Sequence, residues 1–193
     1  DTAWVMVSAA MVLLMTPGLA FFYGGMTRAK STLNMMMMSF GAIALVSVLW
    51  TIYGYSLAFG DSGSGLYGSF TLSGLGSEVN TVPNNGGEYP IPTLAFAAFQ
   101  LMFAIITVAL ISGAIADRTK YLAWGIFAAV WVTLVYFPVA HWVFDFGTKQ
   151  ADGEITGAGW LAALIPEAYG CAGLGITEAV LGDWSVNLIF VAH

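Results

Sequence analysis

Long apolar runs separated by short charged clusters dominate the sequence as far as Asp145. Charged residues stand at both ends of four uncharged runs, which extend from Asp1 to Arg28, Lys30 to Asp61, Glu88 to Asp117 and Lys120 to Asp145. A helix needs about 20 apolar residues to cross the hydrocarbon core of a bilayer, and a charge at its centre costs at least about 2.5 kcal/mol. The pattern therefore predicts an all-α polytopic membrane protein with four transmembrane helices, at about residues 3–23, 33–59, 94–116 and 121–144.

The composition supports a membrane protein and argues against several other classes. Hydrophobic residues make up 59% of the chain and charged residues 8%, whereas a soluble domain carries about 25% charged residues. There is no basic face for nucleic acid. Cys171 is the only cysteine, so the chain has neither an internal disulfide framework nor a cysteine-based metal site. Paired carboxylates, histidine clusters and activated nucleophiles are missing from the spans, so we expect no enzyme activity, no metal and no cofactor.

Basic residues indicate the orientation of the chain. Four of the five lie in two short turns, after the first and third runs: Arg28, Lys30, Arg118 and Lys120. The stretch 60–92, after the second run, has no Lys or Arg and is rich in turn-forming residues. By the positive-inside rule both basic turns face the cytoplasm. We therefore expect a multi-pass protein of the plasma membrane with its amino terminus outside, although Lys149 opposes this weakly, and little regular structure in 60–92.

The third run carries a polar and aromatic stripe. Gln100 and Thr107 are seven residues apart, two helical turns, and therefore share a face on which Phe96, Phe99 and Phe103 also lie. One interpretation is polar packing between helices. The other is a pore-lining stripe with an aromatic constriction. The spacing alone leaves both open.

The outer end of the fourth run combines a histidine with aromatic residues. His141 follows Pro138 and precedes Trp142 and Phe144. A histidine here is either an interfacial or helix-end hydrogen bonder or a proton carrier. The two rings are either part of the aromatic belt at the membrane surface or a site that holds a small cation by cation–π attraction.

Several motifs along the spans are distinctive. They are Thr16-Pro-Gly-Leu-Ala-Phe-Phe-Tyr-Gly-Gly25, Arg28-Ala-Lys30, Leu49–Gly60, Ala98-Phe-Gln100, Gly113–Arg118 and Trp131–His141. In this order and spacing they closely resemble the ammonium transporter family, which includes bacterial ammonium channels, yeast methylammonium permeases and, more distantly, the Rhesus proteins. Gly159–Ala163 looks like the family's approach to its fifth helix.

The resemblance implies a fold and a set of site residues. Family members are trimers of subunits with eleven helices, built as two inverted five-helix repeats plus one helix, with a pore in each subunit. Phe103 falls on the outer-gate phenylalanine, beside Gln100, so both are candidate gate or substrate-binding residues. Phe144 takes the place of the vestibule tryptophan, and Trp142 is placed to compensate for the weaker cation–π face of phenylalanine.

The resemblance stops after Ala163. The family continues with Asp-Phe-Ala-Gly-Gly and a pore histidine, whereas this chain reads Leu164 to Cys171 and shows no further histidine before His193. We therefore assign no pore histidine. The sequence predicts an amino-terminal part of an ammonium transporter domain over 1–163 and an atypical tail over 164–193.

Three functions follow from these predictions. The first is transmembrane transport of ammonium or ammonia in a lipid bilayer, as an apparently truncated member of the family that forms a homotrimer if the family assembly is retained. The second is a non-conducting interaction or regulatory partner of full-length transporters. The third is an inactive fragment.

Overall fold

A computed structural model describes residues 2–60, 65–78, 91–145, 148–149, 155–156 and 159–163. Within these residues, four helical segments are long and apolar enough to span a membrane: Thr2–Met26, Thr32–Phe59, Thr93–Ile115 and Tyr121–Phe144. Their ends lie within three residues of the predicted limits, so the four predicted spans are confirmed. The charged clusters located the spans because a formal charge is tolerated only near the end of such a helix.

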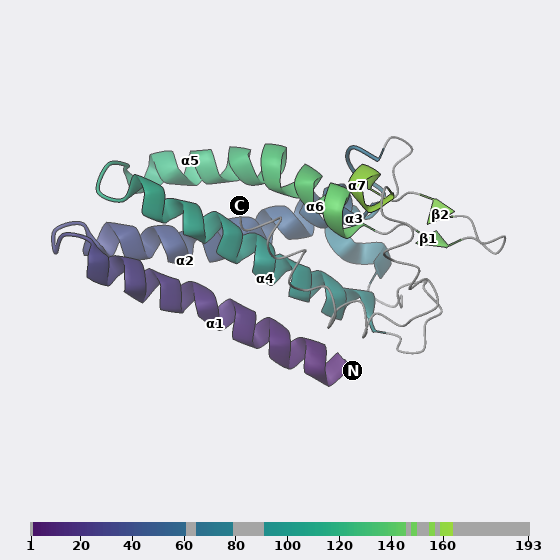
Figure 1. Ribbon diagram of the computed structural model, residues 1–193, viewed down its shortest axis with the longest axis horizontal. Helices are drawn as coiled ribbons and strands as arrows, with labels where there is room; N and C mark the ends of the chain where they lie inside the picture. Colours follow the sequence, from purple (N-terminus) through teal and green to yellow (C-terminus); the bar gives the residue numbers. More distant parts are fainter. Residues whose placement is uncertain are drawn as a thin grey trace.

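The first span is a single helix, and the other three are composite. The first is α1 (Thr2–Met26), which continues through Pro17. The second joins α2 (Thr32–Leu49), the π-helical turn η1 (Trp50–Gly54) and α3 (Tyr55–Phe59), and the third joins α4 (Thr93–Ile111) to a 3-10 turn, η3 (Ser112–Ile115). The fourth joins α5 (Tyr121–Trp131), a second π-helical turn, η4 (Val132–Tyr136), and α6 (Phe137–Phe144). Figure 1 shows them side by side along the long axis of the molecule.

The two short turns, between α1 and α2 and between η3 and α5, lie at the same end of this bundle, which we call the basic end (Figure 1). Asn34 Nδ2 donates to the carbonyl of Thr119 at 3.1 Å, and Arg28 Nε lies 4.0 Å from Asp117 Oδ2. The Tyr23 hydroxyl donates to the Leu110 carbonyl at 3.2 Å. These contacts join the α1–α2 hairpin to the α4–α5 hairpin.

Smaller elements occupy the opposite end, which we call the outer end because the positive-inside rule predicts that it faces outward. They are the 3-10 turn η2 (Ser73–Glu78), the antiparallel strands β1 (Thr148–Lys149) and β2 (Ile155–Thr156), and the short helix α7 (Trp160–Ala163). In the described part of the loop between the second and third spans, 65–78, which we call the outer loop, η2 is the helical element. The pairing of β1 with β2 was not predicted, because two-residue strands leave no hydrophobic pattern to detect.

Small residues line the face that α1 presents to the bundle. Thr16, Ala20 and Gly24 recur every four residues and are the buried residues of this helix. A Cβ atom on Gly24 would lie 3.0 Å from Cγ of Met36. Large apolar side chains such as Trp4, Met11 and Phe21 point outward and are exposed. This distribution is typical of helices in lipid, where close backbone approach replaces the hydrophobic effect as the basis of packing.

Candidate functional site

An aromatic cluster fills the outer half of the bundle. Trp50 packs against Phe137 with a centroid separation of 5.8 Å and against Tyr55 at 6.0 Å. Phe59 and Phe96 meet edge to face at 5.1 Å. The cluster therefore joins the second span to both the third and the fourth, and it positions the outer ends of α3, α4 and α6.

Both π-helical turns border this cluster. The Tyr55 amide donates to the Trp50 carbonyl, and the Phe137 amide donates to the Val132 carbonyl. Each is an i→i+5 bond, which adds a residue to the turn; such turns are frequent at functional sites. In the fourth span, Pro138 is an evident cause because it has no N–H to complete an ordinary α-helical bond.

The two π-helical turns also contact one another. The hydroxyls of Tyr53 and Thr133 lie 2.8 Å apart. The Phe137 ring covers Gly54 so closely that a Cβ atom there would lie 2.5 Å from its Cζ. The second and fourth spans therefore pack closely where both depart from α-helical geometry.

Phe103, the candidate gate residue, pairs with Phe99. Their rings meet edge to face, with centroids 5.0 Å apart and an interplanar angle of 75°. Both are half-buried, as is Gln100 between them. One turn further along α4, the Thr107 hydroxyl donates to the Phe103 carbonyl at 2.7 Å, and Thr107 also hydrogen-bonds the side chain of Tyr136. Thr107 thus links α4 to η4, and like Phe103 and Gln100 it is half-buried.

His141 is a buried hydrogen bonder at the outer end of α6. Its Nδ1 atom lies 3.0 Å from Asp145 Oδ2 and 3.1 Å from the carbonyl oxygen of Ala58. Both partners are acceptors, so Nδ1 carries the proton. The imidazole connects α6 to α3, as expected of a helix-end hydrogen bonder.

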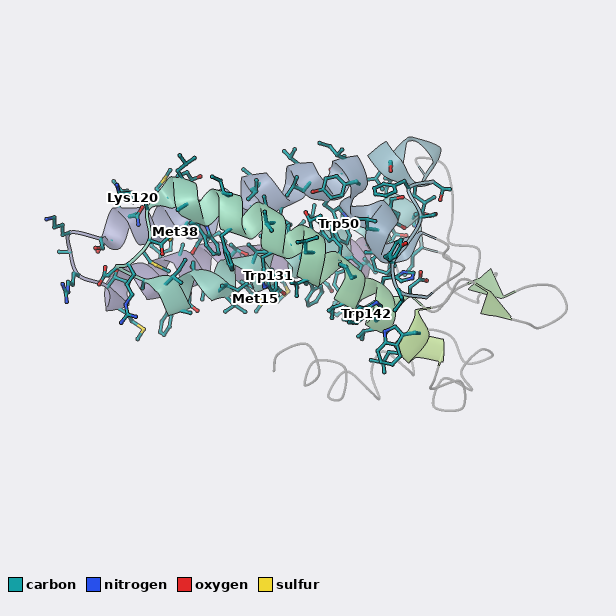
Figure 2. The ribbon with its side chains drawn as sticks, turned by 90° about the horizontal axis from the view of Figure 1, so that it is seen from above. Met15, Met38, Trp50, Lys120, Trp131 and Trp142 are labelled. Carbon is teal, nitrogen blue, oxygen red and sulfur yellow. The ribbon has the colours of Figure 1, made fainter. Side chains whose placement is uncertain are left out.

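The other two candidate residues of the fourth span lie in different surroundings. The Trp142 indole N–H donates to the carbonyl of Leu66, and its ring meets that of Trp160 at 6.0 Å. Phe144 is half-buried against the hydrophobic core. Figure 2 shows Trp142 at the end of the bundle beside α7. Trp142 therefore joins the outer loop and α7, while Phe144 packs inward.

Residues whose structural roles the sequence did not predict hold α7 against α6 and the outer loop. A Cβ atom on Gly159 would clash with the His141 carbonyl, so the chain crosses α6 at a distance that only glycine allows. The Gly159 amide donates to Asp145 O at 2.9 Å, and the Trp160 amide to Gly65 O at 3.0 Å. Nothing in the sequence indicated this crossing, because it brings Gly159 against residues of α6 that are distant along the chain.

Ser56, on α3, anchors the outer loop. Its hydroxyl donates to Ser69 O at 2.6 Å and accepts the Leu72 amide at 2.9 Å. The side chain is completely buried. A single serine inside an apolar run gives no sequence signal for such a role.

In the described residues, apolar helices lie side by side, with basic turns at one end and hydrogen-bonded loops with aromatic rings at the other. This is the architecture of a polytopic membrane protein. The family model described as "Ammonium Transporter Family" matches residues 3–171. The chain belongs to the ammonium transporter family.

Individual relatives agree with this assignment. An ammonium transporter of Mycobacterium tuberculosis (strain H37Rv) is 53% identical over 178 residues, which cover 84% of this chain and 36% of the relative. One of Aquifex aeolicus is 44% identical over 183 residues, 94% of this chain and 42% of the relative. The chain therefore spans less than half the length of these relatives.

Solved structures show the same fold. The crystal structure of Candida albicans Mep2 superimposes with a TM-score of 0.70 at 29% identity, covering 85% of this chain and 33% of that one. A structure titled "Sensor Amt Protein" also gives 0.70, at 25% identity, covering 84% of this chain and 37% of that one. These matches confirm the predicted fold class. Membership of a transporter family likewise agrees with the expectation that the chain is no enzyme.

Proposed function

We propose that these helices belong to a membrane protein that transports ammonium or ammonia. The single observation that carries the proposal is the family match, which covers residues 3–171 and all four spans. The 53% identity to a protein named an ammonium transporter supports the same solute. Because the chain covers only 36% of that relative, the transport activity is proposed for the whole protein of which such helices are a part.

We further propose that Phe103 forms an outer gate and that Gln100, Trp142 and Phe144 contribute to recruiting the solute. The electron-rich face of an aromatic ring attracts a cation by about 2 kcal/mol or more once water is removed. Beyond such rings an apolar path excludes ions, because entry costs them their hydration. The partly exposed Phe99–Phe103 pair supports this role, since a gate needs a ring that is held in place but still accessible.

The family assembly is part of the same proposal. The whole protein is a homotrimer in the plasma membrane, with the amino terminus of this chain outside. The exposed apolar side chains of α1, among them Trp4, Leu14 and Phe22, support burial of this face in lipid or against another subunit. The basic residues at the turns support the orientation.

A chimera tests the transport proposal. Residues 1–163 replace the corresponding part of the M. tuberculosis transporter, and uptake of labelled methylammonium is measured in cells that lack their own transporters. We expect saturable uptake by the chimera. In the Phe103→Ala variant, the maximal rate or the half-saturating concentration of methylammonium should change at least tenfold. Phe21→Ala is the matched control, because Phe21 is 64% exposed on the outer face of α1.

Two outcomes would contradict the proposal at different levels. A chimera that inserts and assembles but takes up no methylammonium contradicts transport. A chimera that transports normally with Phe103→Ala contradicts only the gate. For the 193-residue chain alone in liposomes we expect no flux above that of protein-free vesicles, because half of an inverted repeat does not enclose a pore.

The similarity to the structure titled "Sensor Amt Protein" favours a second candidate, a regulatory partner. Co-purification of the 193-residue chain with a full-length family member, together with absence of flux, would support it. Self-association alone would count against it.

A further inference from the structure

A threonine and a tyrosine connect the fourth span to the backbone of the candidate gate residue. The Thr107 hydroxyl donates to the Phe103 carbonyl at 2.7 Å and also hydrogen-bonds the side chain of Tyr136. A threonine hydroxyl has one proton, and here Phe103 accepts it, so the Tyr136 hydroxyl is the donor in the second bond. The hydrogen bonds therefore run in one direction, from Tyr136 through Thr107 to the carbonyl of Phe103.

The aromatic cluster holds the first residue of this chain of hydrogen bonds. Tyr136 is the last residue of η4 and is buried, and its ring meets that of Phe137 edge to face at 6.3 Å. Phe137 in turn packs against Trp50 of the second span at 5.8 Å and covers Gly54. The Tyr136 hydroxyl is therefore presented to α4 from a ring that the neighbouring spans hold in place.

The last residue of the chain of hydrogen bonds carries the gate ring. A threonine that bonds the carbonyl four residues earlier often bends its helix at that point. In α4 that carbonyl belongs to Phe103, whose ring meets the ring of Phe99 at 5.0 Å. Because the ring and the carbonyl belong to the same residue, a change in the backbone at Phe103 also moves its ring relative to Phe99.

A second pair of the same kind offers an internal comparison. The Thr133 hydroxyl donates to the Ala129 carbonyl at 2.8 Å and lies 2.8 Å from the Tyr53 hydroxyl. Each pair thus combines a threonine bonded four residues back with a tyrosine from another span. The pairs differ in the residue whose carbonyl is held, which is Ala129 in one case and Phe103 in the other.

We propose that Tyr136 and Thr107 are positioning residues for the gate, a role that rests on the proposed function of Phe103. Their hydrogen bonds fix the Phe103 ring against Phe99 in the orientation in which it meets the solute. Both hydroxyls act through Phe103 and need no contact with the solute. Removing either hydroxyl should therefore change how tightly the gate holds a cation, while the amount of protein in the membrane stays the same.

Fluorine NMR of the 193-residue chain in nanodiscs, with 4-fluorophenylalanine at position 103, reports the position of the gate ring without any transport. We expect Tyr136→Phe and Thr107→Val to shift or broaden the fluorine resonance. Thr107→Ser, which keeps the hydroxyl, should give the resonance of the unmodified chain. Tyr53→Phe and Thr133→Val are the matched controls, and neither should change the resonance, because their hydrogen bonds end at Ala129.

Uptake of methylammonium by the chimera that carries residues 1–163 tests the consequence for the gate. In Tyr136→Phe and in Thr107→Val, the half-saturating concentration should change about threefold, as expected for the loss of one neutral hydrogen bond. The amount of transporter at the cell surface should not change. In the Phe103→Ala background neither substitution should alter uptake further, because residues that act through one another are not additive.

Two results would overturn the proposal. An unchanged resonance in Tyr136→Phe and in Thr107→Val would show that the ring does not depend on these hydroxyls. An effect on uptake that persists in full in the Phe103→Ala background would show that the hydroxyls act elsewhere in the bundle. If the unmodified chimera takes up no methylammonium but the two variants shift the resonance, transport is contradicted and the positioning of Phe103 is supported.

Discussion

Gly54 lies beneath the ring of Phe137 at the point where the second and fourth spans meet. Glycine inside a helix costs about 1 kcal/mol relative to alanine, so its presence here needs a packing reason. The reason is the ring, which leaves no room for a Cβ atom. Alanine at this position would gain helix propensity, but this gain is smaller than the cost of placing its Cβ atom against the Phe137 ring.

Gly54→Ala should therefore destabilise the chain. Overpacking costs about 1–3 kcal/mol, and a rigid buried ring such as that of Phe137 cannot yield easily. The free energy of unfolding, measured by titration with a denaturing detergent, should fall by about that amount. Gly18→Ala is the control, because nothing lies within 4 Å of its Cβ position; it should be neutral or stabilising. Equal behaviour of both variants would contradict the packing argument.

The residues of the candidate site could be predicted from the sequence, but the contacts that they make could not. The motif around Gln100 and Phe103 and the histidine and rings at 141–144 were evident from the sequence. That His141 contacts Ala58 and that Trp142 contacts Leu66 was not, since these partners are 83 and 76 residues away. The roles assigned to Phe103, Gln100, Trp142 and Phe144 stay predictions.

Among the elements, the π-helical turns were the hardest to predict. A π-helical turn shifts the helical face by one residue, which a sequence reveals only when one face is polar. In the second and fourth spans every face is largely apolar, so hydrophobic periodicity carries no such signal. Pro138 follows the turn in the fourth span, whereas the turn at Trp50–Gly54 contains no proline.

The outer loop depends on α3 through Ser56. Ser56→Ala would leave the Leu72 amide without its acceptor, which costs about 1–3 kcal/mol for a buried group. We expect amide hydrogen exchange in residues 65–78 to become at least fivefold faster in detergent or nanodiscs. Ser73→Ala is the matched control, because the Ser73 hydroxyl bonds the Phe70 carbonyl in an exposed part of the same loop. Unchanged exchange in Ser56→Ala would show that other contacts hold the loop.

For the whole molecule, charge clusters were sufficient to locate the spans but not to arrange them. The burial of Thr16, Ala20 and Gly24 determines which face of α1 joins the bundle. From the sequence, small residues on α1 could be listed, but Gly18 and Gly25 were equally plausible members of the packed face. The structure distinguishes the buried small residues of α1 from Gly18 and Gly25, because the residues that cover the buried ones come from other helices.

The orientation of the bundle is a testable property at this scale. In a Cys171→Ala background, Gly76→Cys places a thiol in η2 and Thr119→Cys places one in the basic turn. A membrane-impermeant maleimide applied to intact cells should label Gly76→Cys, because the positive-inside rule puts this loop outside. Thr119→Cys should react only after permeabilisation. The opposite pattern would place the basic turns outside.

The contacts that join the basic turns also bear on how the molecule is assembled. The Asn34–Thr119 and Tyr23–Leu110 hydrogen bonds connect residues 85 and 87 positions apart. The α1–α2 hairpin is therefore synthesised and inserted before its partner exists, and until then its contacts with α4 are not formed. Long-range contacts of this kind form late and slow the final step. We therefore expect the two hairpins to dock after both are inserted, and a chaperone or insertase that shields the first one would act in this interval.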